Sequence, residues 1–372
     1  MLNKKIFYVI NDINFFFTHR KEIAQEMHSL GFEVNIIGNE IENSEIKKKY
    51  PNFKFFNFKL NRKSINIFNN LKSLYSLYNI LKNQKLHIIH FITLKPIIYG
   101  LILSNIIKPN KMIFSVSGLG TLFSYNRSLK KKFISFFISL LLKILLINKN
   151  VTFIVQNSRD YDFINSKLSK KSKLYLIKGS GVDLNKFKPK QIFSTKISIL
   201  MASRIILEKG VLEYIDCANH LKNNKNIKFL LCGKIDVGNP SYLSKKHLLN
   251  LCIRNNVEYL GEIEDMAKIL EKINISVLAS YYGEGIPKFL LESASSGKPI
   301  ITTNIPGCKD AVINYYNGIL VPPRNPLALS EAITKLVKNQ NMLHEMGNNS
   351  RHHAQKNFDI KDVVRKHIKI YT

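Results

Sequence analysis

The sequence predicts an α/β protein of two doubly wound domains, each a parallel sheet covered by helices. The first observation is a regular alternation of short apolar runs, which have the length of buried strands, with longer amphipathic segments, which have the length of helices. The second is that this alternation restarts near residue 190. The third is the length of 372 residues, which exceeds what one ordinary core supports. Two parallel sheets are therefore expected.

The first half opens with a strand–helix–strand unit. Residues 5–10 predict a buried strand, residues 18–30 an amphipathic helix, and residues 32–37 the next strand. Asn11 and Asp12 interrupt the N-terminal apolar run, which lacks a small-residue cleavage site, so a strand is favoured over a signal peptide. Further strands are expected at 53–58, 87–91, 112–116, 152–155 and 174–177, and further helices at 67–82, 97–107, 128–146 and 158–168.

The second half repeats this pattern. Strands are expected at 196–202, 228–232, 257–260, 273–279, 299–303 and 319–321, and helices at 211–223, 243–255, 265–272, 287–296, 327–338 and 358–371. We therefore expect an N-terminal domain over residues 1–190, a C-terminal domain over residues 191–355 and a terminal helix within residues 356–372. The cleft between the two domains is the expected ligand site.

The chain is strongly basic, with a formal net charge of +30. One interpretation is a compositional bias, because Lys, Asn and Ile are abundant throughout. The other is an anionic partner, which could be a membrane surface, a nucleic acid or a phosphorylated substrate. No compact basic helix or aromatic-basic module is present, so no nucleic-acid partner is expected.

The four cysteines are spread along the second half without CxxC pairing. This spacing argues against a zinc site and favours a reducing compartment.

Residues 128–148 are more apolar than a helix that covers a soluble sheet requires. The run is too short, and too interrupted by Lys143, to span a bilayer. Two interpretations stay open: a buried core helix, or an interfacial helix on anionic lipid. In the second, the apolar face with Phe136 and Phe137 contacts the lipid, and the flanking lysines Lys130, Lys131, Lys132 and Lys149 hold the anionic headgroups.

Two glutamates mark the stretch from Ser280 to Gly297 as a ligand site. Glu284 lies between two glycines in a loop that follows an apolar strand, and Glu292 lies within the next helix, which Pro287 would begin. A helix start offers unpaired N–H groups and a positive dipole end, which suit a phosphate. A carboxylate one turn further on can accept hydrogen bonds from sugar hydroxyls.

Two cations, Arg204 and Lys209, follow the first strand of the second half. They could be solvated surface charges, or they could clamp a pyrophosphate, with Arg as a bidentate fork and Lys as a point charge. Because Glu284 and Glu292 are predicted on the same edge of the same sheet, the second interpretation is favoured.

These residues together resemble the retaining family 4 glycosyltransferases of the GT-B fold, and the resemblance covers nearly the whole chain. The motifs that carry it are Arg204…Lys209-Gly210, Gly233, Glu284-Gly285…Glu292, Pro306-Gly307 and Asn317-Gly318…Val321-Pro322. The phrases Glu284–Glu292, Ile305–Asp310, Phe17–Arg20 and Ser117–Gly120 look more like one branch, which resembles N-acetylgalactosaminyltransferases. That branch extends lipid-pyrophosphate-linked oligosaccharides for bacterial O-antigen, capsule or protein glycans.

The resemblance implies roles in the C-terminal domain. Arg204 and Lys209 would bind the donor pyrophosphate and stabilise the leaving group, which needs neither a metal nor a cofactor. Glu284 would hold the transferred sugar, and Glu292 the ribose. The remaining donor-binding positions implied are Gly285, Ile286, Pro287 and Lys288 for the sugar and phosphate, and Gly233, Leu260 and Ile263 for the uracil. The reaction would be a front-face displacement that retains the anomeric configuration.

The resemblance also implies acceptor-binding residues and a cellular location. The acceptor-side or cleft candidates are Asn14, His19, Arg20, Ser117 and Gly118. Many members carry a Gly-Gly loop after the first strand and a His beside the donor sugar, whereas this chain has Asn11–Phe15 and Ser117 there. The implied partners are a UDP-sugar, such as UDP-GalNAc or UDP-GlcNAc, and a polyprenyl-pyrophosphate-linked saccharide on the cytoplasmic face of the inner membrane. The terminal helix would return to the N-terminal domain.

Other functions were weighed against this one. A nucleotide-sugar epimerase shares the fold, and a non-catalytic membrane-surface scaffold would explain the charge but not the paired cations and glutamates. Asp160-Tyr161-Asp162 is formally a metal-binding DxD, but it follows Asn157-Ser158 and is better explained as a helix start. Gly118-Leu119-Gly120 lacks the third glycine of a nicotinamide-binding motif. His90 ends a strand, where it could line the cleft or pack, and packing is favoured.

Overall fold

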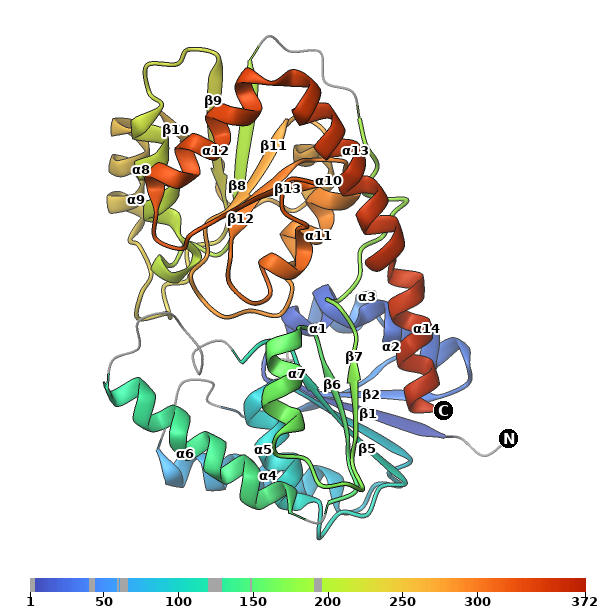
Figure 1. Cartoon of the computed structure of the whole chain (residues 1–372). Helices are drawn as coiled ribbons and strands as arrows, with labels where there is room; N and C mark the ends of the chain where they lie inside the picture. The colour runs from blue at the N-terminus through green and yellow to red at the C-terminus, as the bar shows by residue number, and fades with distance from the viewer. Residues whose placement is uncertain are drawn as a thin grey trace. The chain divides into compact units, whose positions relative to one another are not determined.

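The computed structural model describes residues 4–39, 44–58, 60, 66–119, 129–147, 149–190 and 196–372. The chain divides into two compact units (Figure 1). The described part of unit 1 runs to Leu119, continues over Leu129–Ser180 and ends with Lys361–Thr372, and unit 2 contains Gly181–Ile360. The predicted α/β class is confirmed. The chain enters unit 2 ten residues before the expected boundary at 190 and leaves it at Ile360 instead of residue 355.

Unit 1 contains a parallel sheet of order β3-β2-β1-β4-β5-β6-β7. Its strands are β1 (Lys5–Val9), β2 (Glu33–Gly38), β3 (Lys54–Asn57), β4 (Ile88–Ile92), β5 (Lys111–Val116), β6 (Thr152–Val155) and β7 (Lys173–Leu176). Its helices are α1 (Ile13–His19), α2 (Lys21–Ser29), α3 (Ser44–Lys49), α4 (Ile67–Leu81), α5 (Leu94–Leu103), α6 (Leu129–Leu146), α7 (Ser158–Asn165) and α14 (Ile360–Tyr371). The central strands are apolar on both sides, as strands covered on two faces must be.

Unit 2 contains a second parallel sheet, of order β10-β9-β8-β11-β12-β13. Its strands are β8 (Ile197–Ala202), β9 (Ile227–Cys232), β10 (Val257–Tyr259), β11 (Ile275–Leu278), β12 (Ile300–Thr303) and β13 (Gly318–Val321). Its helices are α8 (Val211–His220), α9 (Lys245–Arg254), α10 (Met266–Leu270), α11 (Lys288–Ser295), α12 (Pro326–Lys338) and α13 (Gln340–Asn357). The strand order reverses between β8 and β11, and doubly wound sheets bind ligands at such switch points.

The last helix, α14, packs into unit 1 through a buried polar network. The hydroxyl of Tyr371 lies 2.7 Å from Nδ1 of His90, whose Nε2 lies 2.6 Å from Oγ of Ser115. Lys111 donates to the carbonyls of Ile370 and Tyr371 at 2.9 and 3.1 Å. Burial lowers the pKa of His90 well below its usual value, with a smaller contribution from nearby charges. His90 therefore packs, as expected, although it lies in the middle of β4 rather than at its end.

Three local predictions need correction. The expected helix 18–30 is two helices, because Asp12 caps a helix that begins at Ile13 and the chain breaks at Arg20. Pro287 is the N-cap of α11 rather than its first residue. The helices α3 and α13 were not predicted, because their sequences are too polar to show an apolar face.

The DxD-like segment is the start of helix α7, as its sequence indicated. Asn157 caps the helix by accepting from the backbone N–H of Asp160 at 2.8 Å. The Asn157 amide also donates to the Asp160 carboxylate at 2.9 Å, and both side chains are buried. Among the described residues, no group of three or more His, Cys, Asp or Glu side chains has a metal-binding arrangement.

The apolar face of helix α6 is exposed, so α6 is not the buried core helix of the first interpretation. Phe136 and Phe137 are exposed, whereas Leu142 and Leu146 are buried. Lys132 is exposed, and nothing is described of the side chains of Lys130 and Lys131. Lys149 is partly exposed and donates to Oγ of Ser104 at 2.8 Å and to the side chain of Asn105. In the described part of the chain, no helix is long and apolar enough to cross a membrane.

Candidate active site

The site is built at the carboxyl edge of the unit 2 sheet, where β11 ends in the loop that leads to α11. Ser280, the second residue after β11, is buried and donates to the Glu284 carboxylate at 2.8 Å. The same hydroxyl donates to the carbonyl of Glu208 at 3.1 Å, which ties this loop to the one that follows β8. Glu284 is thereby held on the switch point between β8 and β11.

Lys209 forms an ion pair with the other oxygen of the Glu284 carboxylate. It is the last residue of a short 3-10 turn, Leu207–Lys209, and its side chain is mostly buried. The pair brings together two of the predicted site residues, which are 75 positions apart in the sequence. Because both groups are largely removed from water, their attraction is screened less than that of a surface pair.

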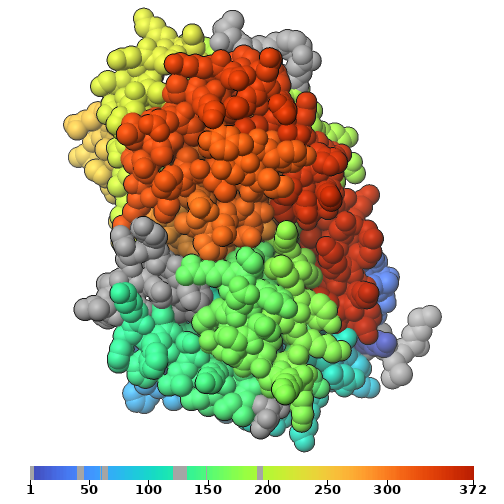
Figure 2. Space-filling view, in the orientation of Figure 1, coloured from blue at the N-terminus to red at the C-terminus, as the bar shows by residue number. Residues whose placement is uncertain are grey.

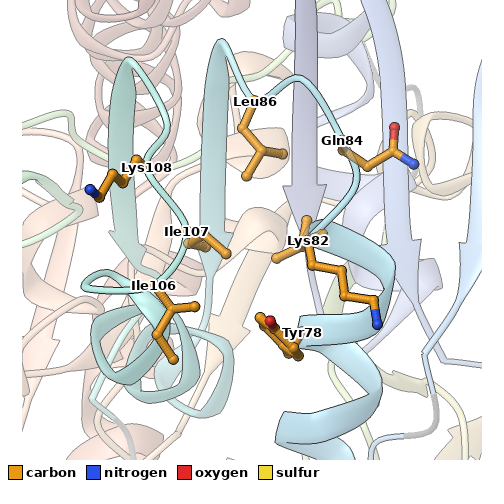
Figure 3. A pocket seen from close by; sticks show the side chains of 8 residues that line it. Tyr78, Lys82, Gln84, Leu86, Ile106, Ile107 and Lys108 are labelled. Carbon is orange, nitrogen blue, oxygen red and sulfur yellow. The ribbon is translucent and has the colours of Figure 1, made fainter.

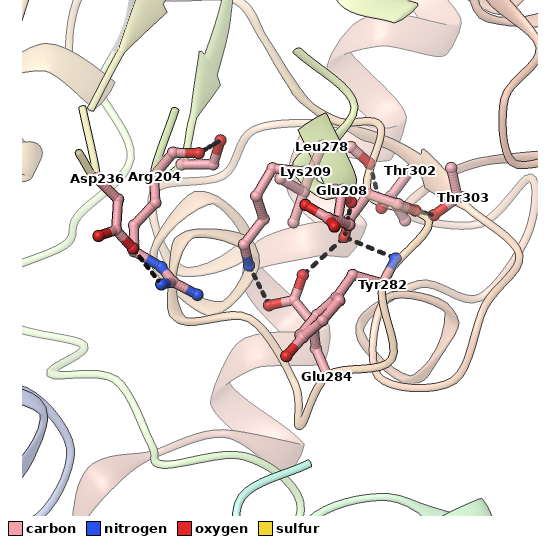
Figure 4. Close-up of polar contacts among 11 residues, drawn as sticks. Arg204, Glu208, Lys209, Asp236, Leu278, Tyr282, Glu284, Thr302 and Thr303 are labelled. Atoms are coloured by element: carbon pink, nitrogen blue, oxygen red, sulfur yellow. Dashed lines mark hydrogen bonds and ion pairs between the residues drawn. The ribbon is translucent and has the colours of Figure 1, made fainter. Parts of the chain in front are cut away.

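Arg204 occupies the same edge of the sheet but pairs with a different carboxylate. Its guanidinium donates to Asp236 at 2.9 Å, and both side chains are partly exposed (Figure 4). Asp236 follows β9, so the ion pair joins the loops after two neighbouring strands. The sequence did not single out Asp236, because an isolated acid in a polar loop carries no motif.

Close backbone packing fixes the loops on this edge. A side chain at Gly233, whose φ is 141°, would place Cβ 1.7 Å from the carbonyl oxygen of Ser203. A side chain at Gly307, whose φ is 87°, would place Cβ 2.2 Å from the carbonyl oxygen of Gly285. Glycine is therefore required at both positions. The predicted motifs with Gly233 and Pro306-Gly307 support the loops that carry Arg204 and Glu284.

Glu292 lies in α11, one residue past the first turn, and is partly buried. Burial raises the pKa of its carboxyl to about 7, and Lys288 and Lys186 oppose the shift. Among the described residues no hydrogen bond to its carboxylate is found, which leaves both oxygens able to accept. Arg351 of α13 fixes the far end of this helix by donating to the carbonyl of Ser295 at 2.8 Å.

The positions predicted to frame a base lie after β9 and β10. Leu260 donates its backbone N–H to Leu231 at 2.8 Å, and Tyr259 donates its hydroxyl to the carbonyl of Gly233 at 2.7 Å. The side chains of Leu260 and Ile263 are partly exposed, and Gly285 and Ile286 are buried beneath the loop of Glu284. Pro287 is the N-cap of α11 and Lys288 is its first residue, so the positive N-terminal end of this helix lies near this edge.

The acceptor-side candidates lie at the carboxyl edge of the unit 1 sheet. Arg20 is only 1% exposed and donates to the carbonyl of His19 at 2.9 Å and to Ser117 at 3.4 Å. His19 stacks on Phe15, with ring centroids 4.0 Å apart. Asn14 is exposed on α1, and Gly118 follows Ser117 with a φ of 105°. The structure therefore brings Arg20 to Ser117, while the ring of the neighbouring His19 packs on Phe15.

One strained residue in unit 1 escaped the sequence analysis. Thr93 follows β4 and has a φ of 75° and a ψ of 160°, a backbone conformation that β-branched residues rarely adopt. Its hydroxyl donates to Asn11 at 3.0 Å, across the switch point between β1 and β4. No sequence signal marks such strain, which makes Thr93 and Asn11 further candidates for this edge.

Comparison with known proteins shows to which class a chain with two such doubly wound units belongs. A family profile described as glycosyl transferases group 1 matches residues 183–353, and one described as glycosyl transferase 4-like matches residues 5–158. The chain belongs to this glycosyltransferase family and is a glycosyltransferase.

Particular relatives are bacterial enzymes of glycan synthesis. The N,N'-diacetylbacillosaminyl-diphospho-undecaprenol alpha-1,3-N-acetylgalactosaminyltransferase of Campylobacter jejuni is 30% identical, over 84% of this chain and 84% of its own. The UDP-Gal:alpha-D-GlcNAc-diphosphoundecaprenol alpha-1,3-galactosyltransferase of Escherichia coli is 25% identical, over 82% and 80%. The solved sucrose-phosphate synthase of Thermosynechococcus elongatus has the same fold, with a TM-score of 0.82 at 17% identity over 99% and 98%.

Proposed function

We propose that the chain is a retaining, metal-independent glycosyltransferase that moves a sugar from a UDP-sugar to an undecaprenyl-diphosphate-linked saccharide. The observation that carries the donor part is the Lys209–Glu284–Ser280 arrangement at the switch point of unit 2. The acceptor part rests on the two named relatives, both of which act on diphospho-undecaprenol-linked sugars. An N-acetylhexosamine donor, UDP-GalNAc or UDP-GlcNAc, is proposed because the Campylobacter relative is an N-acetylgalactosaminyltransferase.

Each charged group has a proposed part in the reaction. Lys209 and Arg204 would bind the donor pyrophosphate and stabilise the negative charge that develops on it when the glycosidic bond to the sugar breaks. Glu284 would accept hydrogen bonds from the transferred sugar, since Ser280 and Lys209 hold its two oxygens in fixed directions. Glu292 would accept hydrogen bonds from the ribose hydroxyls.

The two cations already carry the charge that a metal ion would otherwise supply, which is why we propose that none is needed. On the acceptor side, Arg20, Ser117, His19, Asn14 and Gly118 are proposed to face the lipid-linked sugar. The enzyme would work on the cytoplasmic face of the inner membrane, held there by anionic lipid and by the exposed apolar face of α6.

The experiment is a screen of UDP-sugars with the purified protein and a synthetic undecaprenyl-diphosphate-linked N-acetylated saccharide. The expected product is the acceptor extended by one hexosamine, in the α configuration by NMR and formed equally well in excess EDTA. Extension only in the presence of Mg²⁺ or Mn²⁺ would refute metal independence, and a β-linked product would refute retention. An epimerised nucleotide sugar formed without acceptor would replace this proposal by the epimerase alternative.

A further inference from the structure

Three consecutive helices of unit 1 cover the same face of its sheet. Helices α4, α5 and α6 follow β3, β4 and β5, and each connection moves in the same direction along the strand order. Right-handed crossovers therefore place all three on one face. Gly100 of α5 packs on the ring of Phe91 in β4, whereas the neighbouring His90 faces α14 on the other side. The outer sides of α4, α5 and α6 consequently point away from the sheet together (Figure 1).

Helix α6 lies at the surface of unit 1 (Figure 2), and its exposed residues form an apolar stripe. The exposed members recur every three or four residues, which is one face of a helix: Phe133, Phe136, Phe137, Leu140, Leu141, Ile144 and Ile147. Leu142 and Leu146, on the opposite face, are buried. Lys132 and Lys143 are exposed beside the stripe. Soluble proteins rarely leave such a continuous apolar surface in water.

Helix α4, which was expected as a helix at 67–82 with no assigned role, carries a second exposed apolar stripe. Its members are Ile67, Phe68, Leu71 and Tyr75. Phe68 is 75% exposed, which is more than Phe133 of α6 at 65%. Asn66 caps the helix immediately before this stripe, so its first turns are held in helical form.

Helix α5 joins the two stripes into one surface. Tyr99 of α5 donates its hydroxyl to Asn70 of α4 at 2.9 Å, and both Ile102 of α5 and Ile106, in the turn after α5, are exposed. A cavity of about 160 Å³ separates the end of α4 from the end of α5, with Tyr78 on one side and Ile106 on the other (Figure 3). A second cavity of about 470 Å³ lies between α5 and the C-terminal part of α6. We call the exposed apolar residues of these three helices the platform.

The charge around the platform selects its partner. No Asp or Glu occurs between Glu45 and Asp160, a segment that contains all three helices and the lysines Lys72, Lys108, Lys132 and Lys143. A second copy of this chain would bring like charges together, which disfavours self-association through this surface. An anionic lipid surface offers an apolar acyl region for the exposed apolar side chains and negatively charged headgroups for the lysines.

We propose that α4 and α6 dock together on an anionic membrane, with Phe68 and Leu71 of α4 entering the interface beside the stripe of α6. A single interfacial helix would leave unit 1 free to rotate about that helix, and a second contact fixes its orientation. This inference deepens the proposed membrane location and rests on it. Vesicle binding requires neither a UDP-sugar nor an acceptor, so it fails or succeeds independently of the proposed transfer reaction.

The test is co-sedimentation of the full-length protein with vesicles of phosphatidylcholine that contain about one third phosphatidylglycerol. The variant Phe68→Ser/Leu71→Ser should bind at least about tenfold more weakly than the wild type, because two large apolar side chains no longer enter the interface. Phe136→Ser/Phe137→Ser should weaken binding similarly. The matched control Ile253→Ser, at a position that is 77% exposed on α9 of unit 2, should bind as the wild type does. Wild-type binding by the α4 variant would overturn the proposal.

A second measurement does not depend on how well the serine variants fold. The four native cysteines are buried, so a Phe68→Cys variant can be labelled selectively with an environment-sensitive dye. We expect a blue shift of its emission on addition of the anionic vesicles, no shift with pure phosphatidylcholine, and no shift for a label at Ile253→Cys. An unshifted label at position 68 would refute insertion of α4. Lipid-free dimerisation that Phe68→Ser/Leu71→Ser abolishes would identify a second copy as the occupant instead.

Discussion

Replacement of Glu292 by Gln is expected to stabilise unit 2 in a pH-dependent way. Burial raises the pKa of the folded Glu292 carboxyl to about 7, from a value of 4.5 for the exposed group. A carboxyl whose pKa is raised by folding contributes stability that is present below 4.5 and is lost as the pH rises through 7. At 1.36 kcal/mol per pKa unit, the wild type loses about 3 kcal/mol by pH ~8. Glu292→Gln does not titrate and avoids this loss.

The assay uses the buried cysteines, since Cys217, Cys232, Cys252 and Cys308 all belong to unit 2. Their reaction with 4,4′-dithiodipyridine in increasing urea reports the unfolding of that unit alone. The variant and the wild type should unfold together near pH ~5 and separate by about 3 kcal/mol near pH ~8. Glu258→Gln, an exposed carboxylate in the same unit, is the control and should change stability by less than about 1 kcal/mol. A difference that does not vary with pH would refute the buried-carboxyl argument.

Three further predictions concern the unit 2 site and helix α14. Lys209→Met should lower kcat by about two orders of magnitude or more, because it removes a charge that stabilises the leaving pyrophosphate. The control Lys234→Met, at an exposed position on the neighbouring loop, should change kcat by less than about threefold. Equal effects of the two variants in initial-rate assays would contradict the assignment. Asp236→Asn should tighten UDP binding by up to about fivefold in calorimetry, since it releases Arg204 from a partly exposed ion pair. Weaker binding would contradict this expectation and would show that Asp236 mainly positions Arg204. Acidification from pH ~7 to ~4 should loosen α14, because burial lowers the pKa of His367 from 6.5 to about 3. The stability contributed by a neutral buried histidine is present above the pKa of the exposed group, 6.5, and is lost as the pH falls toward the pKa of the buried group. Unchanged hydrogen-exchange protection over residues 360–371 would contradict this prediction.

Most of the fold could be predicted because apolar strands buried on two faces leave an unambiguous signal. β6 was predicted with its bounds, and most other strands within two residues at each end. The polar helix α13 could not be found, because Arg351 and a few buried residues fix it by tertiary contacts rather than by an apolar face. The early start of α1 was missed because Asp12 was not recognised as an N-cap.

The structure brings predicted residues together where motifs carry glycines and charges, and it adds single polar side chains that no motif marks. Lys209 and Glu284 do meet, although no local pattern shows that they pair. Asp236 and Ser280 have no motif, and their contacts follow only from the order of the strands. The strain at Thr93 and the exposed stripe on α4 depend on tertiary structure, because a sequence does not tell which side of an amphipathic helix another element will cover.

A crystal structure of the protein with UDP tests the central claim most directly, which is that the carboxyl edge of unit 2 holds the donor. The pyrophosphate is expected within hydrogen-bond distance of Lys209 and Arg204, with the ribose hydroxyls on Glu292. UDP bound elsewhere, or bound here with its phosphates away from both cations, would contradict the account.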